Sequence, residues 1–148
     1  MSAKYVLDSC AMLAFIYREN GDEIVKSILK QAQDRNIEVY INKLNLFESY
    51  YDIIRSRDLQ QAENYYAMVK ALPIKIIDGI SDSVFRKAGL LKTQYRISLA
   101  DSIALGETFV LDASLLTSDH HEFDIGGKER KNKVFVDTIN IVVILIQA

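Results

Sequence analysis

The sequence predicts an α/β fold in which helices cover both faces of a mostly parallel sheet, a three-layer α/β/α sandwich. Short apolar segments of strand length alternate with longer segments of helical periodicity, which is typical of parallel sheets. Acidic residues directly follow two of the short segments, at the edge where such sheets hold ligands. The chain has 148 residues and is 49% hydrophobic, so we expect a single domain spanning residues 1–148.

The first elements follow from local patterns. Residues 4–7 are an apolar run that predicts a buried strand ending at Asp8. Residues 10–17 predict a helix closed by an Asn-Gly pair, and residues 23–35 predict an amphipathic helix with one apolar face. Residues 39–41 predict a second short strand.

The later elements rest on the same two periodicities. A helix is expected at 44–57, with an apolar stripe formed by Leu44, Phe47, Tyr51 and Ile54. The remaining expected elements are helices at 59–72, 81–95 and 99–109 and strands at 74–77, 115–117 and 134–136.

Composition narrows the class of protein. The single cysteine, Cys10, excludes a disulfide framework and a cysteine-based zinc site, and it favours a cytoplasmic location. The longest apolar run, 141–146, is shorter than the roughly 20 residues that a membrane span needs, so we expect no membrane partner. A net charge of −2 provides no overall attraction to nucleic acid.

Asp8 and Asp119 each follow a short apolar strand. The carboxyl ends of parallel strands meet at one edge of a sheet, so both acids are expected on the same rim. Each also has a purely structural interpretation. Asp8 is a favourable residue at the start of a helix, and Asp119 is common in turns after strands.

Glu48 lies within the expected apolar stripe, roughly 40° from Leu44 and 60° from Tyr51 around the helix axis. A carboxylate on a buried face is costly unless it is paired or bound to a metal ion. Arg55 projects on the same side two turns later. A structural ion pair with Arg55 and a metal-binding role are therefore equally compatible with the sequence.

Asp101 follows Ser98 by three residues, which is the spacing of a capping box. In that interpretation Ser98 caps the helix at 99–109 and Asp101 occupies its first turn, where the helix dipole favours a negative charge. Capping does not exclude metal binding. If the four acids share one rim they repel one another without a cation, and their oxygen-only chemistry suits Mg²⁺ or Mn²⁺.

Four stretches resemble the successive motifs of PIN domains: YVLDS at 5–9, NLFE at 45–48, SLADSIA at 98–104 and LLTSDHHEF at 115–123. Their order and spacing resemble those of the VapC toxins of VapBC toxin–antitoxin pairs. One departure is the join at 111–113, which lacks the glycine often found there.

The resemblance implies a metal-dependent endoribonuclease that cleaves an RNA substrate, forms a homodimer and is inhibited by a small antitoxin. It also implies that Asp8, Glu48, Asp101 and Asp119 hold Mg²⁺ or Mn²⁺, with Ser9 and Thr117 as supporting hydroxyls. The alternative is a catalytically silent PIN-fold module that binds RNA or protein.

Overall fold

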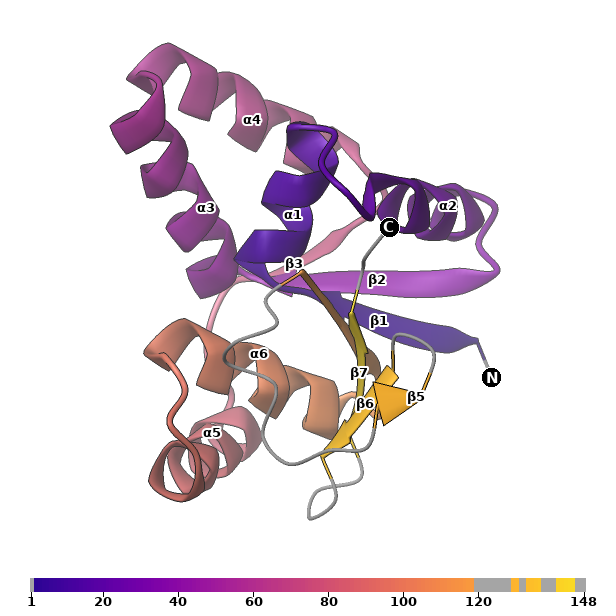
Figure 1. Cartoon of the computed structure of the whole chain (residues 1–148), viewed down its shortest axis with the longest axis vertical. Coiled ribbons are helices and arrows are strands. Elements are labelled where there is room, and N and C mark those ends of the chain that lie inside the picture. Colours follow the sequence, from indigo (N-terminus) through magenta and orange to yellow (C-terminus); the bar gives the residue numbers. More distant parts are fainter. Residues whose placement is uncertain (1, 119–128, 131–132, 137–140, 146–148) are drawn as a thin grey trace.

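A computed structural model describes residues 2–118, 129–130, 133–136 and 141–145 of the chain, with side chains up to residue 118 (Figure 1). Six α-helices are present in this part: α1 (Ser9–Ile16), α2 (Asp22–Gln33), α3 (Lys43–Ser56), α4 (Leu59–Ala71), α5 (Asp82–Gln94) and α6 (Leu99–Val110). Each of the six helices expected from the sequence is therefore present, with no end displaced by more than two residues.

The described strands form one sheet. They are β1 (Ala3–Leu7), β2 (Ile37–Asn42), β3 (Lys75–Ile77), β4 (Ser114–Thr117), β5 (Glu129–Arg130), β6 (Lys133–Val136) and β7 (Ile141–Leu145). Their order across the sheet is β3-β2-β1-β4-β7-β6-β5. Pairing is parallel from β3 to β7 and antiparallel from β7 to β5. The prediction of a mostly parallel α/β/α sandwich is confirmed.

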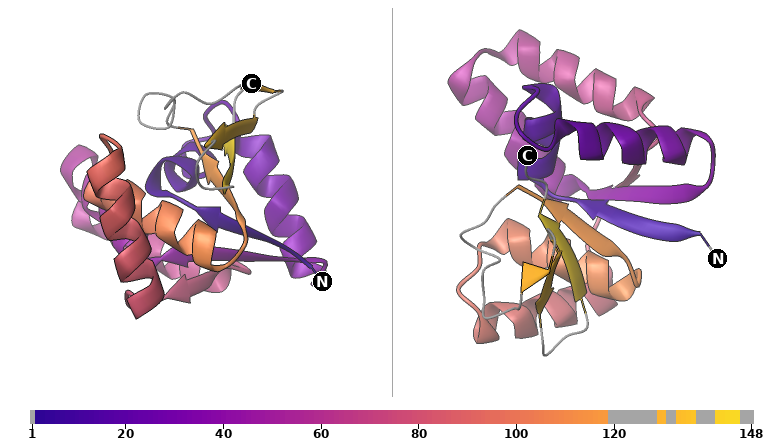
Figure 2. Two further views of the ribbon diagram at one scale, coloured as in Figure 1. Left: turned by 90° about the horizontal axis from the view of Figure 1, so that it is seen from below. Right: turned by 45° about the vertical axis from the view of Figure 1, so that its right-hand side comes forward.

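The helices form two layers, with α1 to α4 on one side of the sheet and α5 and α6 on the other (Figures 1 and 2). Side chains alternate between the faces of a strand, and neighbouring residues of β1 show the effect. Leu7 packs into the core cluster beneath α1 to α4, whereas Val6 packs into the cluster beneath α5 and α6. Both side chains are fully buried, so β1 is covered on both faces.

In the turn between α6 and β4, an aspartate occupies the backbone conformation for which glycine is usually favoured. Asp112 has a φ of 52°, in the left-handed region where glycine is usually favoured and where aspartate is tolerated better than most residues. Asp112 thus occupies the conformation that reverses the chain after α6, and the missing glycine does not disturb the fold.

Two sequence expectations need correction. The stripe expected to be the core face of α3 is exposed instead, with Phe47 56%, Tyr51 41% and Ile54 37% accessible. The buried face of α3 consists of Asn45, Leu46, Ser49 and Ile53. Because the inner face carries polar residues and the outer face carries aromatic residues, hydrophobic periodicity predicts the wrong buried face for α3.

Strand β7 was not among the elements predicted from the sequence. It pairs in parallel with β4, from Ser114 opposite Val142 to Thr117 opposite Leu145. Among the described helices, none has the length and apolar character needed to cross a membrane.

Candidate active site

The order of strands places a reversal between β1 and β4. From β1 the chain proceeds to β2 and β3 on one side, and β4 is then added on the other side of β1. Open parallel sheets bind ligands at such a reversal, beyond the carboxyl ends of the strands. Asp8 directly follows β1 and its backbone N–H donates to the carbonyl of Leu116 in β4 at 3.4 Å. Thr117, fully buried, ends β4.

Asp8 is held rigidly at this position. It is the N-cap of α1, and its Oδ1 accepts a hydrogen bond from the backbone N–H of Ala11 at 2.8 Å. The side chain is only 1% exposed. The capping interpretation is therefore confirmed. A carboxylate buried at the switch point of a parallel sheet remains well placed for chemistry.

Ser9 connects Asp8 to a second acid. Ser9 is buried at the start of α1, and its hydroxyl donates a short hydrogen bond to Oε1 of Glu48. Glu48 is half-buried in the second turn of α3. The structure thus brings Glu48 next to the residue that follows Asp8, although the two acids are 40 positions apart in the sequence.

The ion pair that competed with this arrangement is not formed. Arg55 pairs with Asp52, one turn away on the same helix, and its guanidinium lies 6.0 Å from the centre of the Tyr51 ring. Because Arg55 is engaged elsewhere, the structure does not support it as the partner of Glu48.

Asp101 bonds to the N-cap residue Ser98, as the spacing of the two residues predicted. The Ser98 hydroxyl accepts from the backbone N–H of Asp101 at 3.1 Å and donates to Oδ2 of Asp101 at 2.7 Å. Asp101 lies in the first turn of α6 and is 7% exposed. The positive end of the helix dipole therefore supports its negative charge.

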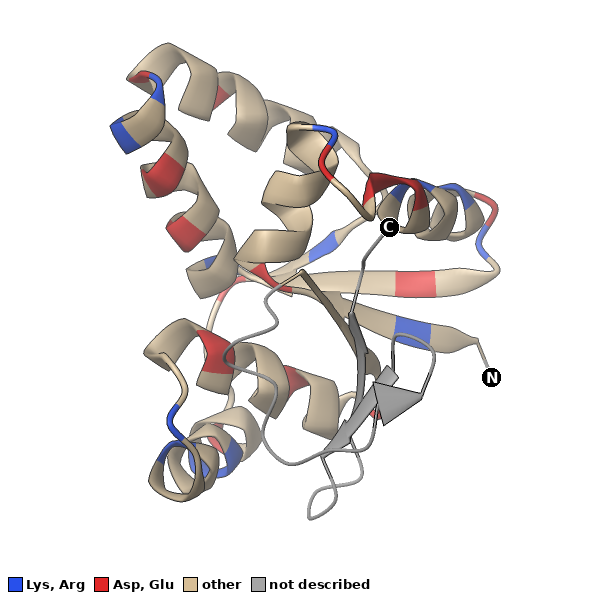
Figure 3. Ribbon diagram, viewed as in Figure 1, with Lys and Arg blue, Asp and Glu red and all other residues tan. Residues whose placement is uncertain are grey.

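A groove joins Glu48 to the start of α6. Its volume is about 260 Å³, and it is lined by Leu44, Phe47, Glu48, Tyr51, Ser98, Leu99 and Ala100. One side of the groove is α3 and the other is the capping segment before Asp101. Acidic positions on α3 and α6 are coloured red in Figure 3. The groove is the space through which a ligand would reach both helices.

The acids do not form a compact cluster by themselves. Between residues 2 and 118, and in the short strands described beyond them, no three acidic, histidine or cysteine side chains lie close enough to hold one metal ion. Three of the four predicted ligands are described, and two of these, Glu48 and Asp101, accept hydrogen bonds from serine hydroxyls. Asp119, the fourth predicted ligand, lies outside the described residues.

Three buried polar residues near these elements were not predicted as part of a site: Asn42, Asn45 and Glu107. Asn45 lies one turn before Glu48 on α3 and is fully buried. Neither its side-chain nitrogen nor its oxygen has a hydrogen-bond partner in the part of the chain that the structure describes. Buried amides are normally paired, so Asn45 calls for an explanation.

Glu107 lies on the buried face of α6 and is 4% exposed. Burial raises the pKa of its carboxyl above the ordinary value of 4.5, while a hydrogen bond from Asn42 opposes the rise. The only signal in the sequence is a glutamate within a largely apolar helix. Its partner is 65 positions away, beyond the reach of any local pattern.

Comparison with known proteins gives the family. Residues 5–127 match the PIN domain, whereas no curated protein matches the chain. The solved structure of VapBC2 from Rickettsia felis, bound to a DNA fragment from its promoter, matches with a TM-score of 0.66 and 20% identity. The match covers 82% of this chain and 91% of the chain in that structure.

Two further solved structures agree. The VapC20 toxin of Mycobacterium tuberculosis, described as cleaving the sarcin–ricin loop, has a TM-score of 0.62 and 11% identity, over 86% of this chain and 98% of that chain. DNA-bound VapBC from Salmonella typhimurium has a TM-score of 0.64 and 12% identity, over 82% of this chain and 91% of that chain. At these identities the likeness establishes the fold.

Proposed function

The chain belongs to the PIN domain family, and from that premise we propose that it is a metal-dependent endoribonuclease that hydrolyses RNA phosphodiester bonds. The observation that carries the proposal is the hydrogen bond between Ser9 and Glu48. Glu48 comes from a distant segment of the chain and is bonded to the residue that follows Asp8 at the switch point of the sheet. A helix cap needs only Asp8, so capping does not explain why Glu48 is brought there.

The side chains present suit a divalent cation. The proposed ligands Asp8, Glu48, Asp101 and Asp119 offer only oxygen atoms, the donors that Mg²⁺ and Mn²⁺ prefer. The buried amide of Asn45, which has no hydrogen-bond partner among the described residues, lies roughly 60° from Glu48 around the helix axis. A hydrated ion beside Glu48 would give that amide a water molecule to bind.

Each residue of the proposed site has a role in this proposal. A bound Mg²⁺ or Mn²⁺ would lower the pKa of a water molecule and offset the charge of a phosphate. Asp8 and Asp101 are fixed in place by their caps and would hold the ion with Glu48. Ser9 would orient Glu48, and Thr117 would support the site from the end of β4. The RNA substrate would enter along the groove beside Glu48.

The test is cleavage of a mixed RNA pool by purified protein with Mg²⁺, with Mn²⁺ and with EDTA. We expect cleavage with either metal and none with EDTA. Asp101→Asn should abolish cleavage while thermal stability stays unchanged or rises, because lost repulsion between carboxylates offsets a capping interaction of about 1 kcal/mol. Retained cleavage with a large fall in melting temperature would assign Asp101 a structural role only.

The silent-module alternative makes the opposite prediction in the same assay. A binding module would retain RNA without cutting it, and retention would not depend on the metal. Gel-shift measurements on the same RNA pool, in EDTA and in Mn²⁺, separate the two functions.

We also propose that the chain forms a homodimer. Large apolar side chains are exposed on three helices, including Phe47 on α3 at 56%, Phe85 on α5 at 69% and Leu99 on α6 at 63%. Aromatic residues are enriched at interface cores. Tyr51, on the same helix as Phe47, is also exposed, whereas Tyr65 of α4 is buried within the core. Light scattering that finds a monomer at every concentration would refute the dimer.

A small antitoxin is the further partner proposed, and the cytoplasm the proposed location. Solved neighbours include VapBC complexes, and an antitoxin segment that places an arginine or lysine among the carboxylates would replace the cation's charge. Co-purification with the product of an adjacent small gene should block RNA cleavage. Full cleavage by the co-purified complex would contradict the proposed antitoxin but not the proposed nuclease activity.

A further inference from the structure

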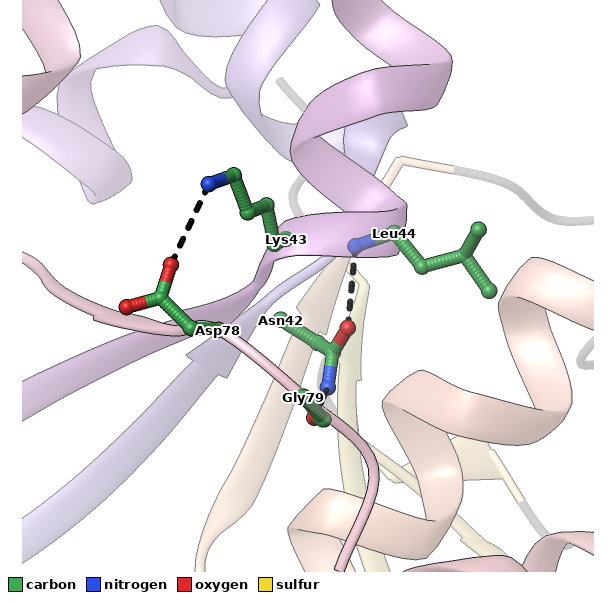
Figure 4. A network of polar contacts seen from close by, with 5 residues as sticks. All are labelled: Asn42, Lys43, Leu44, Asp78 and Gly79. Carbon is green, nitrogen blue, oxygen red and sulfur yellow. Dashed lines mark hydrogen bonds and ion pairs between the residues drawn. The ribbon is translucent and has the colours of Figure 1, made fainter.

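Asn42 joins three segments of the chain at the point where β2 ends and α3 begins. Its Oδ1 accepts from the backbone N–H of Leu44 at 2.9 Å, which makes Asn42 the N-cap of α3. Its Nδ2 donates to the carbonyl of Gly79, in the loop after β3, at 2.9 Å (Figure 4). The same nitrogen donates to Oε1 of Glu107 on α6, also at 2.9 Å.

These bonds use the whole amide. The side chain of asparagine has two N–H donors and one carbonyl acceptor, and each donor has a separate acceptor here. Asn42 is 2% exposed and Glu107 is 4% exposed, so water does not compete for the bond between them. Breaking a buried bond of this kind leaves its partner unsatisfied, and the hub therefore resists small displacements.

The hub connects the two helices that carry acids of the proposed site. Glu48 is in the second turn of α3, and Asp101 is in the first turn of α6. The same end of α3 makes an apolar contact, because Leu44 packs against the cluster of Val84, Ala88 and Ile103 from α5 and α6. Asn42 supplies the directional contact beside that apolar one.

We propose that Asn42 and Glu107 are positioning residues, whose hydrogen bond sets the placement of α3, and with it Glu48, against the helix that carries Asp101. The inference rests on the proposed function, since positioning matters only if the two acids act together. Neither residue touches the metal or the RNA in this proposal. Both act through the helices that present the ligands, as supporting residues do around metal sites.

A helix cap alone is the competing explanation, and the choice of variants separates the two. Asn42→Ser keeps an oxygen that can cap α3 but removes both donors. Glu107→Leu removes the acceptor on α6 and leaves the cap intact. Glu107→Gln is the conservative variant, because its amide oxygen can still accept from Asn42. Asp58→Ala is the control: Asp58 caps α4 through the N–H of Gln61 at 2.8 Å, and α4 carries none of the proposed ligands.

Isothermal titration with Mn²⁺ alone, on folded protein, gives the first readout. We expect Asn42→Ser and Glu107→Leu to weaken Mn²⁺ binding by about 10-fold or more, and Glu107→Gln and Asp58→Ala to bind as the wild type does. Wild-type affinity in Asn42→Ser and Glu107→Leu would overturn the proposal. A loss in Asp58→Ala equal to that in Asn42→Ser would also overturn it, because general loss of helix capping would then account for the effect.

Hydrogen exchange gives a second readout that does not depend on metal binding. In Asn42→Ser and Glu107→Leu we expect faster exchange in residues 43–48 and in residues 101–107, and wild-type protection in Glu107→Gln. Unchanged exchange in these segments would overturn the role of the hub. If the wild-type protein neither binds Mn²⁺ nor cleaves RNA, the proposed function fails instead, and the exchange result still decides whether the bond couples the helices.

Discussion

Replacing Asn45 with leucine should make the protein more stable and less active. Asn45 is fully buried on α3, and neither polar atom of its side chain has a partner among the described residues. An unsatisfied buried polar group costs roughly 1–3 kcal/mol. Leucine has a similar size and no polar atom, so Asn45→Leu removes that cost without opening a cavity.

The magnitude follows from these terms. With a penalty of about 1 kcal/mol for the different shape of leucine, we expect a net gain of about 1 kcal/mol in the free energy of unfolding. For a chain of 148 residues, a change of 1 kcal/mol shifts the melting temperature by roughly 2–4 °C. The expected rise is therefore about 2–4 °C. Mn²⁺ binding should weaken in the same variant, because the amide is proposed to bind a water molecule of the hydrated ion.

Thermal unfolding followed by circular dichroism, with metal removed, measures the first effect. Asn64→Leu is the matched control, since Asn64 is exposed on the neighbouring helix α4, and its change should stay within roughly 0.5 kcal/mol. An Asn45→Leu protein that is less stable than the wild type would refute the reasoning. It would mean that the amide has a partner that stabilises the metal-free fold.

Two further predictions concern buried polar groups. Burial raises the pKa of Glu107 above 4.5, so the folded protein retains a proton that the unfolded chain releases, and stability falls as pH rises from 4.5 through the folded pKa. Glu107→Gln should therefore gain stability relative to the wild type across that window in urea titrations, and a pH-independent difference would contradict this. Tyr65→Phe should cost about 1 kcal/mol by removing the buried bond to the Ser49 hydroxyl at 2.6 Å. RNA cleavage should be unchanged, and a loss of cleavage without a loss of stability would contradict a structural role.

What the sequence could predict was local. The capping box of Ser98 and Asp101 is contained in four consecutive residues, and the cap at Asp8 depends on the three residues that follow it. Both were predicted because helix starts have strong side-chain preferences. The strand β1 was also predicted, since a short apolar run between polar residues is typical of a buried strand.

The errors and omissions come from contacts between distant segments. The hydrogen bond from Asn42 to Glu107 spans 65 positions, and no pattern within either helix indicates it. On α3, the polar residues Asn45 and Ser49 are buried, and Ser49 is hydrogen-bonded to Tyr65 of α4, so hydrophobicity alone identified the wrong face. The role of Glu48 stays a prediction, but its expected burial within an apolar stripe was wrong. The Ser9 hydroxyl holds it instead.

The two faces of α3 also have a consequence for genetics. Substitutions at Leu46 and Ile53, which face the core, would lower the amount of folded protein and appear as loss of abundance. A substitution at Glu48 would leave abundance intact and remove only the proposed activity. Phe47 and Tyr51 are exposed and would tolerate polar substitutions in a lone subunit. A mutational scan that records abundance and activity separately would therefore divide one helix into lengthwise strips, each with its own phenotype.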